Sequence, residues 1–150
     1  MIPFVPREHG KWPKRFIELA NHIAEWSKDP STKVGAVIVR PDNSIVSMGY
    51  NGYARGVEDI FLDNREFKYA RTIHAELNAV LSARTSVEGC HVYASLCPCS
   101  NCASSLIQAG ISKVFFNPIP EELFERWGDS FEVTFDIFGQ AGVEYAEVKL

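Results

Sequence analysis

The sequence predicts an α/β fold: a three-layer α-β-α domain built around a mixed five-stranded sheet. Helical and strand-like segments alternate through the second half of the chain, a pattern typical of parallel strands joined by helices. Two strand-like segments in the first half are separated by a short turn and indicate an antiparallel hairpin, which makes the sheet mixed. With 150 residues, 46% of them hydrophobic, the chain can bury roughly two-thirds of its unfolded surface. We therefore expect a single domain over residues 1–150.

An amphipathic helix is expected first, over residues 12–28. Its apolar residues recur at the i, i+3, i+4, i+7 spacing, which places them on one helical face. These residues are Phe16, Leu19, Ala20 and Ile23. Asp29-Pro30 ends the segment, because the residue before a proline avoids the helical region.

A β-hairpin is expected next. Residues 34–39 form a continuous run rich in β-branched side chains, typical of a buried strand. Pro41-Asp42-Asn43 supplies turn residues, and residues 45–50 form the partner strand. Residues 51–70 have no regular pattern and are expected to be irregular.

The second half of the chain shows the alternation most clearly. Its helices are marked by Ala- and Leu-rich segments or by a glycine just past the end, and its strands by β-branched and aromatic runs. In order, we expect a helix over 74–83, a strand over 91–95, a helix over 99–109, a strand over 113–116, a helix over 130–140 and a strand over 143–148.

Composition and charge exclude several classes of protein. A net charge of −4 and a pI near 5.6, with no long basic cluster, disfavour a nucleic-acid partner, because proteins that bind nucleic acids usually carry a basic face. No apolar run approaches the roughly 20 residues of a membrane-spanning helix, and the N-terminus lacks a signal-peptide core. Four cysteines, two of them assigned to a metal below, favour a reducing compartment. The expected location is the cytoplasm.

Two short motifs carry the chemistry: His74-Ala75-Glu76 and Pro98-Cys99-Ser100-Asn101-Cys102. His74, Cys99 and Cys102 are expected to supply three zinc ligands, and a catalytic zinc site usually has three protein ligands and one open position. Cys99 and Cys102 are three residues apart, so one helical turn directs both sulfurs the same way. A helix beginning near Pro98 would place them at its N-terminus, where the dipole favours thiolate.

Glu76 is too close to His74 along the chain to share its helical face, but it can reach over the open position. There it would act as the proton shuttle, taking a proton from a zinc-bound water that attacks the ring carbon bearing an amine. A Cys-x-x-Cys pair is also found in structural zinc sites and redox pairs. Cys97 is a conceivable fourth ligand of a structural site, although it precedes Pro98 and is expected to face away.

The sequence resembles the deoxycytidylate (dCMP) deaminases of the wider cytidine deaminase fold, over roughly residues 12–143. The His-Ala-Glu and Pro-Cys-x-x-Cys elements are shared by zinc-dependent nucleobase deaminases. Other segments are similar to the dCMP branch more narrowly: residues 27–30, 34–36, 49–52 (Gly-Tyr-Asn-Gly), 74–79 (His-Ala-Glu-Leu-Asn-Ala) and 107–111. The resemblance implies a hydrolase that converts dCMP and water to dUMP and ammonia, with one catalytic Zn²⁺ per subunit.

The resemblance also implies contacts with the substrate. The backbone N–H of Ala75 and the Cys99 region would meet the ring carbonyl and the water, and Asn51 would hydrogen-bond the sugar. Ser27 and Lys28 are the expected contacts of the phosphate. Each has a plainer interpretation: Asn51-Gly52 is a favourable turn pair, and Lys28 suits a helix C-terminus.

The family further implies a homo-oligomer, a hexamer or smaller, and regulation by dCTP and dTTP through residues 49–52. The chain departs from the family at Cys97 and over residues 117–127, where relatives place a tyrosine-bearing loop. The alternatives are the same chemistry on cytidine, cytosine, a modified pyrimidine or a guanine-like base, or a zinc module without catalytic activity. Residues 61–69 are either a solvated loop or a lid over the pocket.

Overall fold

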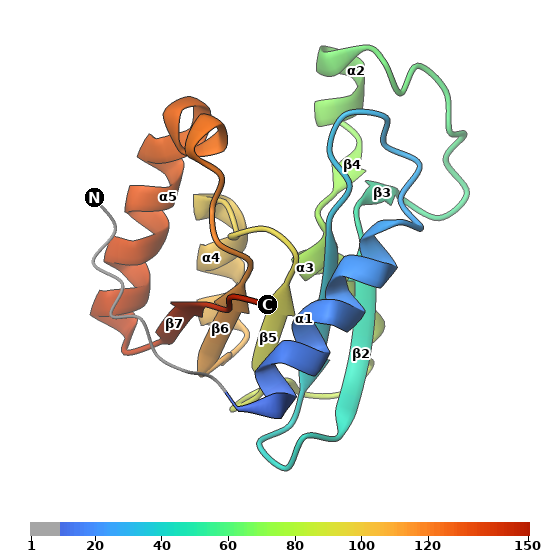
Figure 1. Cartoon of the computed structure of the whole chain (residues 1–150). Coiled ribbons are helices and arrows are strands. Elements are labelled where there is room, and N and C mark those ends of the chain that lie inside the picture. Colours follow the sequence, from blue (N-terminus) through green and yellow to red (C-terminus); the bar gives the residue numbers. More distant parts are fainter. Residues whose placement is uncertain (1–9) are drawn as a thin grey trace.

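The computed structural model describes residues 10–150, so the first nine residues of the expected domain lie outside the described part of the chain. Its centre is a five-stranded sheet in the order β2-β1-β5-β6-β7 (Figure 1). The strands are β1 (Gly35–Val39), β2 (Ile45–Tyr50), β5 (His91–Ala94), β6 (Lys113–Phe116) and β7 (Glu144–Glu147). β1 is antiparallel to both β2 and β5, whereas β5, β6 and β7 are parallel. The predicted mixed α/β sheet is confirmed.

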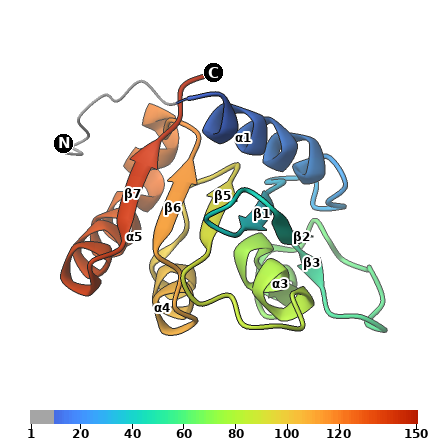
Figure 2. The ribbon, with the colours of Figure 1, turned by 90° about the horizontal axis from the view of Figure 1, so that it is seen from below.

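Helices cover both faces of this sheet. α1 (Lys11–Ala24) packs across β1, β2, β5 and β6 on one face. α3 (Ala75–Ser82), α4 (Ser100–Gln108) and α5 (Glu121–Ala141) lie on the opposite face, as the view in Figure 2 shows. No helix among residues 10–150 is both long and apolar enough to cross a membrane.

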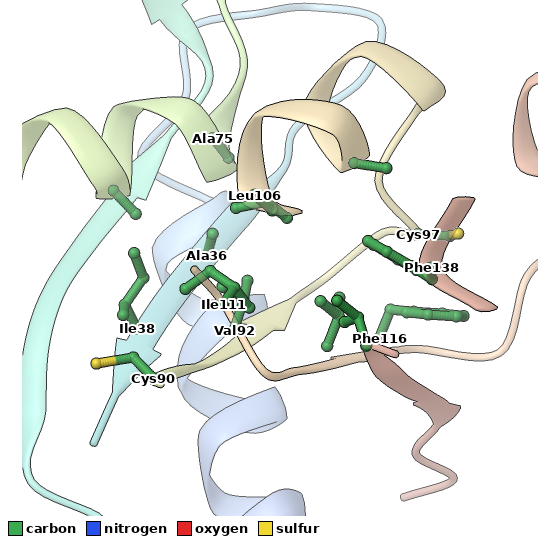
Figure 3. Close-up of a cluster of buried hydrophobic side chains, with 14 of the residues drawn as sticks. Ala36, Ile38, Ala75, Cys90, Val92, Cys97, Leu106, Ile111, Phe116 and Phe138 are labelled. Atoms are coloured by element: carbon green, nitrogen blue, oxygen red, sulfur yellow. The ribbon is translucent and has the colours of Figure 1, made fainter. Parts of the chain in front are cut away.

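The core is divided between the two faces by the alternation of strand side chains. In β1, Ala36 and Ile38 belong to the larger cluster beneath α3, α4 and α5 (Figure 3), whereas Val37 and Val39 belong to the cluster beneath α1. All five residues of β1 are buried. This explains why the strand is a continuous apolar run: a central strand has no solvent-facing side.

Two glycines allow helices to approach the hairpin closely. A Cβ atom at Gly35 would overlap with the carbonyl oxygen of Ala20 in α1. A Cβ atom at Gly49 would lie 2.5 Å from the backbone nitrogen of Ala79 in α3. The hairpin is thus clamped between α1 and α3, which fixes α3 relative to the sheet.

Two predicted helix boundaries were wrong. α1 ends at Ala24 rather than at residue 28, because the Ser27 hydroxyl donates to the Asn51 carbonyl and accepts from the Asp29 N–H, competing with the helix. α5 begins at Glu121 rather than at residue 130. Its first turn carries Glu121 and Glu122, which suit the positive end of the helix dipole.

The stretch expected to be irregular, residues 51–70, contains a short strand and a short helix. β3 (Gly52–Tyr53) pairs with β4 (Thr72–Ile73), and between them lies α2 (Arg65–Tyr69). The Asn64 side chain accepts a hydrogen bond from the Phe67 N–H and so caps α2. The small two-stranded sheet delivers the chain directly to His74 and the start of α3.

Candidate metal centre

Three potential metal ligands meet at the N-termini of α3 and α4. His74 and Cys99 are the residues that precede these helices, and Cys102 lies in the first turn of α4. His74 Nδ1 is 3.1 Å from Cys102 Sγ and 3.5 Å from Cys99 Sγ. All three ligand atoms lie within 4.8 Å of one another. Neighbouring ligands of a tetrahedral zinc are about 3.5–3.8 Å apart. The donor types fit zinc, and the His74–Cys99 distance lies in this range, whereas the His74–Cys102 distance is shorter.

The interaction between the Cys99 and Cys102 thiols favours a thiolate at Cys99, which suits the binding of a cation. The pKa of the Cys99 thiol is lowered, chiefly by its hydrogen bond with Cys102 and further by the His74 ring. The same shared hydrogen bond, together with burial, raises the pKa of Cys102. Cys99 therefore loses its proton more readily than Cys102, and zinc would bind both sulfurs as thiolates.

Glu76 lies beside this cluster without belonging to it. Its side chain is buried in the first turn of α3, with the residue only 4% exposed. Burial raises the pKa of the carboxyl to about 7, against the opposing effect of the His74 charge. A carboxyl with a pKa near neutrality can both accept and donate a proton.

Cys97 lies outside the ligand cluster found among residues 10–150. Its thiol is buried and points toward the carbonyl of Pro98, with Sγ 3.6 Å from that oxygen. Burial raises its pKa, so it remains a neutral thiol. The cluster thus offers three ligands, which leaves one tetrahedral position open.

The residues predicted to bind the sugar and phosphate occupy a second region. The Asn51 side chain accepts from the Val34 N–H and donates to the Thr32 carbonyl, both at 2.9 Å. Lys28 is exposed and forms an ion pair with Asp59, with Nζ 2.6 Å from Oδ2. Lys28, Asn51 and Asp59 line one pocket, whose lining does not include the metal ligands.

The other two predicted contacts are placed differently. Ser27 is buried and donates to the Asn51 carbonyl, so it supports the loop rather than lining the pocket. Ala75 is the fully buried first residue of α3. Its N–H is one of the helix-terminal amides that lack a partner within the helix.

A buried ion pair was missed by sequence reasoning. Lys68 of α2 lies 3.0 Å from Asp29, and both side chains are nearly inaccessible to solvent. Burial raises the pKa of Asp29, but the hydrogen bonds from the Ser31 and Thr32 N–H groups and the interaction with Lys68 together outweigh this effect. The pKa of Asp29 is therefore lowered overall. Lys68 falls in the segment expected to be a solvated loop or a lid. No local signal marks the pair, because its members are 39 residues apart.

The sequence around these motifs is similar to that of known proteins. Residues 10–117 match the family model described as the cytidine and deoxycytidylate deaminase zinc-binding region. The chain is 51% identical over 136 residues to an uncharacterized deaminase in the luxG 3′ region of Aliivibrio fischeri, covering 90% of this chain and 92% of that protein.

Further similarity extends to a protein of named activity and to a solved structure. The chain is 40% identical over 148 residues to the deoxycytidylate deaminase of Homo sapiens, covering 92% of this chain and 80% of that one. The dCMP deaminase of cyanophage S-TIM5, solved in complex with dCMP and dUMP, superposes with a TM-score of 0.75 at 23% identity. That alignment covers 95% of this chain and all of the phage protein, and it shows a shared fold.

Proposed function

The chain belongs to the cytidine and deoxycytidylate deaminase family, and from this premise we propose that it converts dCMP and water to dUMP and ammonia. It is a zinc-dependent deaminase, a hydrolase with the His/Cys/Cys site typical of the family. The choice of dCMP is supported by the 40% identity to the human deoxycytidylate deaminase across 92% of this chain.

His74, Cys99 and Cys102 would hold the zinc ion, and Glu76 would move the protons. Zinc, when bound, supplies a Lewis acid that makes water a nucleophile at neutral pH. Glu76 accepts a proton from the attacking water as its oxygen bonds to C4 of the cytosine ring, and it donates that proton to N3. Glu76 then takes the remaining proton from the new C4 hydroxyl and passes it to the amine, which departs as ammonia while the C4 carbonyl forms.

The position of Glu76 supports this role. Its carboxyl is buried beside the ligands, and burial raises its pKa to about 7, so the same group can act as base and then as acid. The Ala75 N–H, at the start of the same helix, is proposed to hold the ring carbonyl. Both contacts come from one rigid turn of α3.

The residues proposed to contact the sugar and the phosphate already have partners within the protein. The Asn51 amide already holds Thr32 and Val34, so a sugar hydroxyl would use its remaining N–H or lone pair. Lys28 would exchange Asp59 for the phosphate, and Ser27 would act indirectly by holding the Asn51 backbone. A homo-oligomer, a hexamer or smaller, regulation by dCTP and dTTP, and a cytoplasmic location complete the proposal.

The substrate is tested by ammonia release from dCMP, deoxycytidine, CMP, cytosine and guanine, using the zinc-loaded protein. We expect the highest kcat/KM for dCMP and at least a severalfold loss for deoxycytidine, which differs only by the phosphate. Lys28→Met should raise KM for dCMP but not for deoxycytidine, and Lys33→Met, outside the pocket lining, should change neither. A preference for an unphosphorylated ring would discard dCMP while keeping the zinc chemistry.

A further inference from the structure

Two hydroxyl groups of α5 contact the segment that carries the metal ligands. Thr134 Oγ1 donates to the Pro98 carbonyl at 2.9 Å. One helical turn earlier, Ser130 Oγ accepts from the Ser100 N–H at 3.0 Å and lies 3.3 Å from Ser100 Oγ. Residues four apart share a helical face, so both hydroxyls are directed at the N-terminus of α4.

These two hydrogen bonds bracket Cys99. The Pro98 carbonyl belongs to the peptide group before Cys99, and the Ser100 N–H belongs to the one after it. Fixing both peptide planes fixes the backbone between them, which is extended with φ −68° and ψ 167°. The direction of the Cα–Cβ bond follows from the backbone, so the backbone fixes the point from which the Cys99 sulfur reaches His74 Nδ1, 3.5 Å away.

The setting of Thr134 indicates a specific role for its hydroxyl. Thr134 is completely buried in a helix whose other buried residues are Phe131, Phe135 and Phe138. A polar side chain in such surroundings is uncommon unless it has a partner. Without this hydroxyl, the Pro98 carbonyl would keep only the longer and weaker contact from the Cys97 thiol, 3.6 Å away. Ser130 likewise serves a helix-terminal N–H that has no acceptor within α4.

We propose that Ser130 and Thr134 are positioning residues of the metal centre: together they preset the Cys99 thiolate for zinc. They are not among the candidate metal ligands and act through the Cys99 backbone. The inference rests on the metal ligands and is independent of which ring the enzyme deaminates. Outer groups that orient metal ligands commonly contribute 10- to 100-fold to metal affinity.

The variants separate the hydroxyl from the packing around it. Thr134→Val keeps the shape and removes the hydroxyl, whereas Thr134→Ser keeps the hydroxyl and removes a methyl group. Ser130→Ala removes the second hydroxyl at a position that is only half-buried. Ser105→Ala is the matched control, because Ser105 Oγ donates to the Asn101 carbonyl within α4 and the residue is exposed.

Three measurements on the full chain provide the test: the rate of zinc loss to a chromogenic chelator, the thiolate-to-metal absorption band of the cobalt-substituted protein, and the Tm of the metal-free protein. We expect Thr134→Val and Ser130→Ala each to lose zinc about tenfold faster, and the double variant up to about 100-fold faster. Their cobalt band should shift. Thr134→Ser and Ser105→Ala should behave like the parent.

Parental zinc loss and a parental cobalt band in Thr134→Val and Ser130→Ala would overturn the proposal, even if the metal-free Tm falls. Equal defects in Thr134→Ser and Thr134→Val would also overturn it, because packing would then be the cause. If Thr134→Val does not fold, Ser130→Ala decides: faster zinc loss with an unchanged metal-free Tm supports the proposal, and parental behaviour rejects it.

Discussion

Glu76 and Cys102 stand next to each other at the metal centre but have different tasks. Cys102 supplies a ligand atom that lies 3.1 Å from His74 Nδ1. Glu76 is buried beside the same atoms without joining the cluster, and burial raises its pKa. Removing a ligand should therefore change metal binding and stability, whereas altering Glu76 should change turnover alone.

Cys102→Ala is expected to lose stoichiometric zinc and to unfold at a lower temperature than the zinc-loaded parent, because the free energy of metal binding contributes to folding. Its Tm should no longer respond to a strong chelator, whereas the Tm of the parent should fall. Metal analysis and thermal unfolding with and without chelator measure both effects.

Cys97→Ala is the matched control, since Cys97 is equally buried but outside the cluster. It should retain one zinc per chain. Loss of zinc in Cys97→Ala, or full zinc in Cys102→Ala, would contradict the ligand assignment and favour a site of different composition.

At the scale of elements, α2 is tied to the turn after α1 by the buried Lys68–Asp29 pair. Asp29 also accepts from the Ser31 and Thr32 N–H groups, so one carboxylate organises the turn and receives α2. Thr32 and Val34 are held in turn by Asn51. These contacts join the segment that leads into His74 to the edge of the main sheet.

Lys68→Met should lower the free energy of unfolding by about 3 kcal/mol, the lower end of the range for removing one partner of a buried pair, since Asp29 keeps two N–H donors. Urea denaturation measures this. Folding lowers the pKa of Asp29 below its unfolded-state value of 3.8. The pair therefore stabilises the protein at pH values above 3.8, and this stabilisation is lost as the pH falls through the folded-state pKa. The difference between variant and parent should therefore shrink below about pH 4.

Lys28→Met provides the comparison, because the Lys28–Asp59 pair is exposed and solvent screens it. Its unfolding curve should match that of the parent. Equal effects of the two substitutions, or no effect of Lys68→Met, would show that the buried pair does not hold α2 in place.

Local patterns account for what the sequence could predict. The strand runs, the apolar periodicity of α1 and the His-Ala-Glu and Pro-Cys-x-x-Cys motifs are all encoded within a few neighbouring residues. The beginning of α5 was missed because residues 121–129 are helical partly through tertiary packing: Leu123 and Phe124 pack against the larger core cluster. The Thr134–Pro98 bond joins residues 36 apart, and no sequence period reports such a contact.

At the scale of the whole molecule, the hairpin and the helices α3, α4 and α5 together position the metal centre. The hairpin clamps α3 through the close approach at Gly49, and α5 supports the N-terminus of α4 through Ser130 and Thr134. α3 and α4 pack against each other, so their N-termini bring His74, Cys99 and Cys102 together. The fold thus provides a ligand set from three separate positions in the sequence, with Glu76 beside it.

The most direct test of this account measures zinc content and turnover together in Glu76→Gln, a substitution that keeps the shape and removes the titratable proton. One zinc per chain and a parental Tm are expected, with kcat for the best substrate lowered about 10²- to 10⁴-fold because the general acid–base group is gone. Turnover within a few-fold of the parent at full zinc occupancy would contradict the assignment of Glu76 as the proton shuttle. Loss of zinc together with activity would show instead that Glu76 takes part in holding the metal.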